Sequence, residues 1–170
     1  MPTTFTKIGS VTVGAGGAAT MDFTSIPATF TDLCVKLSGR SARAGQQADN
    51  LFITFNSNTT GYTMKALTGN GTSAGSVGYS SRYASFAVDA AGSTASTFSS
   101  HEIYIPNYTS ANYKSFSADS VSENNATAAQ SDLIAGLWSN TAAITSISLL
   151  PEVSTWVQYT TATLYGIKNS

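Results

Sequence analysis

The sequence predicts an all-β protein, a single jelly-roll or Greek-key β-sandwich domain that spans residues 1–170. Short runs of β-branched and aromatic residues recur about every 10 to 20 residues, separated by clusters of Gly, Asn, Ser and Pro. Helical periodicity is nearly absent. Each run presents one apolar face, so two sheets have to stack to bury these faces.

Eleven runs have the pattern of strands. In DLCVKLSGR, for example, Leu33, Val35 and Leu37 lie on one face, because side chains two residues apart in a strand point the same way. We expect strands at residues 5–13, 18–25, 31–39, 50–56, 61–67, 77–88, 98–106, 113–121, 131–139, 143–150 and 160–168.

Glycine and other small residues mark the connections between these strands. VGAGGAA at 13–19 and GNGTSAG at 69–75 suit left-handed or bulged backbone. DAAGSTAST at 89–97 and NNATAAQ at 124–130 have the composition of loops. None of these segments is long enough to be an interdomain linker, so we expect one domain.

The final segment, TATLYGIK at 161–168, alternates like a half-buried strand. We expect it to insert beside earlier strands and to hold this end of the chain in a sheet, since loose termini carry no such pattern. The alternation is strict only as far as Tyr165. Leu164 and Ile167 would share a face only if Gly166 marked a bulge or a bend.

The chain is polar but has few charged residues. Asp, Glu, Lys and Arg make up 10% of the residues, against about 25% in an average globular protein, whereas 25 Ser and 24 Thr supply hydroxyl groups. A net charge of -1 gives no electrostatic footprint for nucleic acid or for an anionic membrane, so we expect neither as a partner. We also expect synthesis in the cytoplasm, since MPTTFTKIGS does not resemble a secretory signal.

The single cysteine and the single histidine limit the chemistry that the chain can perform. Cys34 cannot form an internal disulfide, and its place in LCVKL predicts a small buried hydrophobic residue. His101 is expected to be a hydrogen-bonded or solvent-facing strand residue, because Glu102 beside it points to the opposite face. One residue of each kind cannot form a structural zinc site, whereas an oxygen-only calcium site stays open.

Two converging carboxylates would be needed to cleave a glycosidic bond, and their spacing in the sequence neither shows nor forbids such a pair. Because the carboxylates are scattered along the sequence, we assign no catalytic residue, no cofactor and no metal ligand. The carboxylates in or near loop-like positions are Asp49, Asp89, Asp119, Glu123 and Asp132.

All three arginines lie in the first half of the chain, and one of them has tyrosines on both sides. Arg82 lies between Tyr79 and Tyr83 in GYSSRYASF, and both residue types are enriched at interface hot spots. With Arg40 and Arg43, these residues form the candidate partner-binding set, since the planar guanidinium suits interface carbonyls and carboxylates. The alternative is that they are ordinary strand tyrosines and surface charges.

The two tryptophans could stack on sugars, but large aromatic residues in sandwich strands usually lie in the core or at a subunit interface. Trp138 follows Leu133 and Leu137 in an apolar run, which places it inside the protein. Trp156 lies in a loop-like stretch after Pro151 and could instead stack on a sugar.

Long stretches of the chain resemble one protein family. They are TSIPATFTDLCVKLSGRS, NLFITFNSNTTGYTMKALTGNG, IYIPNYTSANYKSFSADS, AGLWSNTAAITSISLL and TATLYGIK. Their succession is similar to a jelly-roll domain of tailed-bacteriophage structural proteins, in particular the cement (decoration) proteins of capsids. The likeness extends over almost the whole chain, and its motifs are structural.

The resemblance implies a virion protein without catalytic activity. On this basis we expect a homotrimer that binds the major capsid protein on the outer surface of the phage head and stabilises the contacts between capsomers. One alternative is a receptor- or carbohydrate-binding virion module with Trp156 or Tyr83 in a sugar platform. The other is a glycan-cleaving enzyme that uses converging carboxylates.

Overall fold

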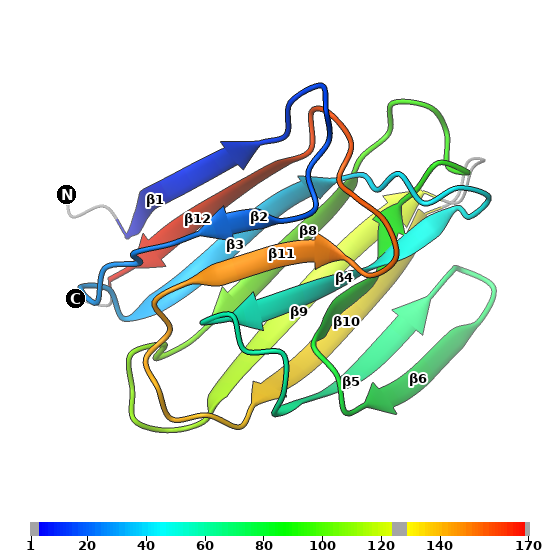
Figure 1. Ribbon diagram of the computed structural model, residues 1–170. Coiled ribbons are helices and arrows are strands. Elements are labelled where there is room, and N and C mark those ends of the chain that lie inside the picture. The colour runs from blue at the N-terminus through cyan, green and yellow to red at the C-terminus, as the bar shows by residue number, and fades with distance from the viewer. Residues whose placement is uncertain (1–3, 124–128, 169–170) are drawn as a thin grey trace.

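The computed structural model describes residues 4–123 and 129–168, which form a β-sandwich of two antiparallel sheets (Figure 1). The prediction of an all-β fold with two stacked sheets is confirmed. The strands are β1 (Phe5–Thr12), β2 (Met21–Phe23), β3 (Asp32–Gly39), β4 (Ala48–Phe55), β5 (Tyr62–Gly69), β6 (Ala74–Tyr79), β7 (Tyr83–Asp89), β8 (Ser99–Ile105), β9 (Lys114–Glu123), β10 (Ala129–Trp138), β11 (Ile147–Pro151) and β12 (Thr161–Ile167).

Eight of the strands form four nested antiparallel pairs, β1 with β12, β2 with β11, β3 with β8, and β4 with β7. Strands β1 to β4 therefore pair, in order, with strands from progressively earlier positions in the second part of the chain. Successive pairs alternate between the sheets, and contacts of β12 with β3 and of β11 with β4 join the pairs side by side.

Two inserted hairpins, β5–β6 and β9–β10, extend only one of the sheets. The larger sheet has the order β1-β12-β3-β8-β9-β10-β5-β6, and the smaller has β2-β11-β4-β7. The smaller sheet ends at β7, which packs against β8, β9 and β10 of the larger sheet. Strands β5 and β6 of the larger sheet continue beyond β7. In Figure 1 this hairpin lies at the lower right.

The core lies between the sheets and contains both tryptophans. Trp138 packs against Phe55 and Tyr62, with ring centroids 5.5 and 6.0 Å away, so the prediction that it lies inside is confirmed. Trp156 is fully buried, and its indole N–H donates to the carbonyl of Leu149 at 3.0 Å. The alternative that Trp156 stacks on a sugar is therefore wrong. Cys34 is buried, as predicted.

The expected strand over residues 77–88 is wrong, because the structure has two strands there. β6 belongs to the larger sheet and β7 to the smaller one, and the chain crosses between the sheets at residues 80–82. Two serines and an arginine make this crossing without Gly or Pro, so the usual turn signal is missing. Of the loop expected at 124–130, residues 124–128 lie outside the described part and 129–130 begin β10.

The last strand, β12, lies between β1 and β3, as Figure 1 shows by its position beside the blue β1. Gly166 does not mark a bulge in the pairing with β3, because that pairing runs without interruption through Ile167. Gly166 is required for another reason, since an added Cβ would overlap the ring of Phe30. The register shift lies in β1, between Lys7 and Gly9.

Candidate functional site

Four aromatic side chains meet where the end of β6 approaches the edge of the smaller sheet. The ring of Tyr79 lies 5.5 Å from that of Tyr83 and 5.9 Å from that of Phe86. Tyr83 in turn lies 4.8 Å from Phe52, its register partner on β4. We call Phe52, Tyr79, Arg82, Tyr83 and Phe86 the aromatic surface, because all five side chains remain at least partly exposed.

The side chain of Arg82 is fixed on this surface by two contacts. Its guanidinium carbon lies 4.6 Å from the centroid of the Phe52 ring, a cation–π geometry, and Nη1 donates a hydrogen bond of 3.0 Å to the Thr54 hydroxyl. The backbone carbonyl of Arg82 also accepts from the N–H of Ile53 at 3.0 Å. A positive charge with remaining N–H donors is therefore held beside exposed aromatic rings.

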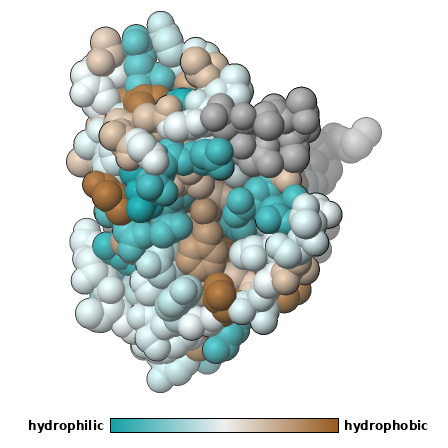
Figure 2. Space-filling view, turned by 90° about the vertical axis from the view of Figure 1, so that its right-hand side faces the viewer, coloured by the Kyte–Doolittle hydropathy of each residue, from teal (hydrophilic) through white to brown (hydrophobic). Residues whose placement is uncertain are grey.

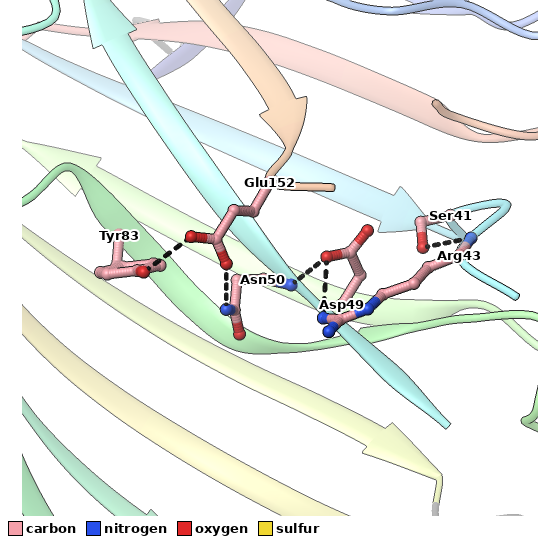
Figure 3. A network of polar contacts seen from close by, with 6 residues as sticks. All are labelled: Ser41, Arg43, Asp49, Asn50, Tyr83 and Glu152. Carbon is pink, nitrogen blue, oxygen red and sulfur yellow. Dashed lines mark hydrogen bonds and ion pairs between the residues drawn. The ribbon is translucent and has the colours of Figure 1, made fainter. Parts of the chain in front are cut away.

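A polar network borders the aromatic surface (Figure 3). The carboxylate of Glu152 accepts a hydrogen bond from the Tyr83 hydroxyl at 2.9 Å and another from the Asn50 amide at 2.5 Å. Partial burial raises the pKa of Tyr83 to about 12, and the hydrogen bond to the Glu152 carboxylate adds to this shift. The phenol consequently remains a protonated donor at neutral pH.

Arg43 lies further along the same network. Its guanidinium is 3.4 Å from the buried Asp49 carboxylate, whose oxygen also accepts from the N–H of Asn50 at 2.8 Å (Figure 3). The structure thus brings together Tyr79, Arg82 and Tyr83 of the predicted set and joins Arg43 to them through hydrogen-bonded neighbours.

Arg40 is separate from the aromatic surface and is only 8% exposed. Its guanidinium donates to the carbonyls of Thr94 and Thr97, both at 2.9 Å, and to that of Ser93 at 3.2 Å. These donors are used inside the chain, where they hold the loop that follows β7. The expectation that Arg40 faces a partner is not supported by this position.

Replacing Arg40 by Lys should lower the free energy of unfolding by about 3 kcal/mol, since an ammonium cannot reproduce the forked contacts to several carbonyls. Urea unfolding measures this loss. Arg43→Lys is the matched control, because a lysine there can keep its one contact to Asp49 and should cost less than about 1 kcal/mol. Equal losses in the two variants would contradict the bracing role of Arg40.

Figure 2 shows the end of the molecule that carries the β5–β6 hairpin. Hydrophobic side chains gather in the middle of this face, between hydrophilic ones. Tyr79 is the most exposed member of the aromatic surface, at 50%. A surface that combines exposed aromatic rings with a fixed arginine has the composition of an interface hot spot.

The expectation that the carboxylates lie in or near loops holds for Asp89 and Glu123, the last residues of their strands, and is wrong for Asp119, which lies within β9. Asp49, Asp89, Asp119, Glu123 and Asp132 lie in strands β4, β7, β9, β9 and β10. Three of them, Asp49, Asp89 and Asp132, are buried, where a polysaccharide chain cannot reach them. In the described ranges, no three His, Cys, Asp or Glu side chains gather so that they could hold a metal ion.

His101 is buried, and its Nε2 lies 2.7 Å from the Ser99 hydroxyl, which confirms the hydrogen-bonded alternative of the prediction. Burial lowers the pKa of His101 to about 3, so the ring is neutral at pH 7. Residues 4–123 and 129–168 contain no helix of sufficient length and apolarity to cross a membrane.

Sequence reasoning missed Phe52, Phe86, Asn50 and Glu152. Phe52 and Tyr83 become neighbours through the pairing of β4 with β7, and Glu152 arrives from the end of β11. These contacts join segments that are far apart in the sequence, so no local sequence pattern predicts them. The only local signal was the aromatic character of the run around Arg82.

No family model matches the chain, and no similar curated protein or solved structure was found.

Proposed function

We propose that this protein is a non-catalytic virion component, a decoration protein that binds the outer surface of a phage head as a homotrimer. The observation that carries the proposal is the aromatic surface, which presents Tyr79, Arg82 and Tyr83 together on one exposed face. These residue types dominate binding energy at protein interfaces. The major capsid protein is the proposed partner.

The connectivity supports the structural part of the proposal. Four strand pairs are nested in reverse order and alternate between two sheets, which we infer to be jelly-roll connectivity with two inserted hairpins. Binding through aromatic, hydroxyl and amide groups depends little on ionic strength, unlike exposed ion pairs. Three such surfaces in one trimer would raise avidity well above that of a single contact.

The first test is the mass of the purified protein by light scattering at low salt and at about 1 M salt, where the Debye length falls to roughly 3 Å. We expect a trimer under both conditions. A monomer under both would remove the trivalent attachment on which the proposal depends.

The second test is rebinding to phage heads stripped of the protein. We expect Tyr79→Ser and Arg82→Ala each to weaken rebinding at least tenfold, about 1.4 kcal/mol per contact. Tyr113→Ser is the matched control, because Tyr113 is 61% exposed and lies outside the aromatic surface. Undiminished rebinding by both site variants would exclude this surface as the attachment site.

Carbohydrate binding is the second candidate, and it rests on the same surface. Glu152 and Asn50 place a carboxylate and an amide beside the half-buried ring of Tyr83, a combination that can hold a sugar hydroxyl and a ring face. Binding on a glycan array that is lost in Tyr83→Ala and kept in Tyr113→Ser would favour this function.

A further inference from the structure

The last strand of the larger sheet, β6, has an unpaired edge. Its six residues, AGSVGY, are all exposed, and in the described part of the chain no strand lies beyond it. An edge strand presents a row of backbone N–H and C=O groups that can pair with another chain. Natural proteins usually protect such edges with a charge, a proline, a bulge or a covering segment.

The other three sheet edges carry such protection. β1 has Lys7 and a register shift beside it, and β2 is only three residues long. β7 has register shifts, and its Phe86 N–H donates at 2.8 Å to the Asp132 carboxylate. β6 itself carries no charge and no proline, and its register with β5 is continuous.

A groove lies next to this edge on the outer face of the larger sheet. It has a volume of about 570 Å³, and its walls include Leu67 and Leu133. These two leucines are register partners on β5 and β10 and are 61% and 56% exposed. On β6 the groove is lined by Ser76, Val77 and Gly78, and the two of these that share the outer face with Lys65 and Leu67, Ser76 and Gly78, are small. We call this hollow the edge groove.

Lys65 gives the edge groove its charge. Among the described residues it is the only charged one in the lining, and its side chain extends over Gly78, its register partner, toward the free edge. Leu67 occupies the next outward position on β5 and faces Ser76. The edge therefore offers a cationic position and an apolar position two residues apart on one face.

We propose that β6 accepts, as an added strand, an extended segment of a partner protein that carries a carboxylate and a large apolar side chain two residues apart. Backbone pairing with β6 would supply affinity, and the two side chains would supply specificity. The apolar side chain reaches Leu67 and Leu133 across Ser76, and the carboxylate meets Lys65 across Gly78.

A second copy of β6 fits this site poorly. On the outer face, its own side chains are Ala74, Ser76 and Gly78, which are too small to cover Leu67 and Leu133. It also offers no carboxylate to Lys65. These two features favour a segment of another protein over self-pairing. Self-pairing would protect the amides of residues 74–79 in the free protein.

The probe is a labelled peptide, Thr-Leu-Thr-Glu-Thr-Leu-Thr, which presents the required pair in either strand direction. We expect it to bind with a dissociation constant below about 1 mM and to slow hydrogen exchange of amides in residues 74–79. Replacing its Glu by Lys should weaken binding about tenfold or more, and prolines in place of the central threonines should abolish it.

Two variants of the protein test the site itself. Lys65→Glu should invert the preference between the Glu and Lys peptides, a result that nonspecific adsorption would not give. Ser76→Lys should abolish binding, whereas Ser100→Lys, an exposed serine on the central strand β8, should leave binding unchanged.

Several outcomes would overturn the proposal. They are no binding at about 1 mM peptide, equal binding of the Glu and Lys peptides to both forms of the protein, or a free protein that already protects residues 74–79 by self-association. The experiment contains no capsid, so its result is independent of the function proposed above.

Discussion

A chain that lacks residues 161–170 is expected to lose cooperative folding and, with it, any soluble trimer. β12 forms the backbone ladder to both β1 and β3, so its removal separates β1 from the rest of the larger sheet. It also removes the buried side chains of Ala162 and Leu164. Loss of a single buried leucine side chain already costs about 2 to 5 kcal/mol, against a total stability of about 5 to 15 kcal/mol for a domain.

Urea titration followed by circular dichroism measures this effect, and size exclusion reports the assembly state. Thr163→Ala is the control, because Thr163 lies on the same strand and is only partly buried. It should unfold cooperatively within about 1 kcal/mol of the wild type. A truncated chain with a sharp unfolding transition would show that β12 is dispensable.

The strands of this fold could largely be predicted because they follow a local rule. Side chains alternate with a period of two, so segments such as DLCVKLSGR reveal a buried face without any knowledge of their neighbours. The same rule fails at residues 77–88, where apolar and aromatic residues continue through the crossing from one sheet to the other. Which sheet a strand joins depends on contacts with distant segments.

The candidate site could be predicted only in part, for the same reason. Tyr79, Arg82 and Tyr83 are close in sequence and stay close in space. Arg40 looks like any surface arginine, and only the return of the 93–97 loop to its guanidinium makes it internal. The sequence predicts Asp49, Asp89 and Asp132 in or near loops, and their burial depends on the pairing of distant strands, which no local pattern encodes.

Two buried ionisable groups should give the stability of this protein opposing dependences on pH. Burial raises the pKa of Asp89 to about 6. The hydrogen bond from the Glu123 N–H and the charge of Arg40 oppose this rise in pKa, and the Glu123 carboxylate adds to it. Burial lowers the pKa of His101 to about 3, and its Nδ1 has no hydrogen-bond partner among the described residues. Asp132, whose pKa burial also raises, acts in the same direction as Asp89.

The sign of each effect follows from which state binds the proton more tightly. The folded state holds the Asp89 proton more tightly than the unfolded chain, so this contribution is complete below pH 3.8 and is lost as the pH rises to about 6. The folded state holds a proton on His101 less tightly, so that contribution is complete above pH 6.5 and is lost as the pH falls to about 3. Each slope is about 1.4 kcal/mol per pH unit.

Between about pH 4 and pH 6 the two slopes oppose each other, and single substitutions should separate them. Relative to the wild type, the unfolding free energy of Asp89→Asn should rise with pH by about 1.4 kcal/mol per unit, and that of His101→Gln should fall by as much. Urea titrations at half-unit pH intervals measure both slopes, and a loss of stability common to all pH values leaves them unchanged. If the unfolding free energies of both variants ran parallel to that of the wild type, neither group would change its protonation on unfolding. Opposite slopes relative to the wild type would identify these buried strand residues as the source of the pH response.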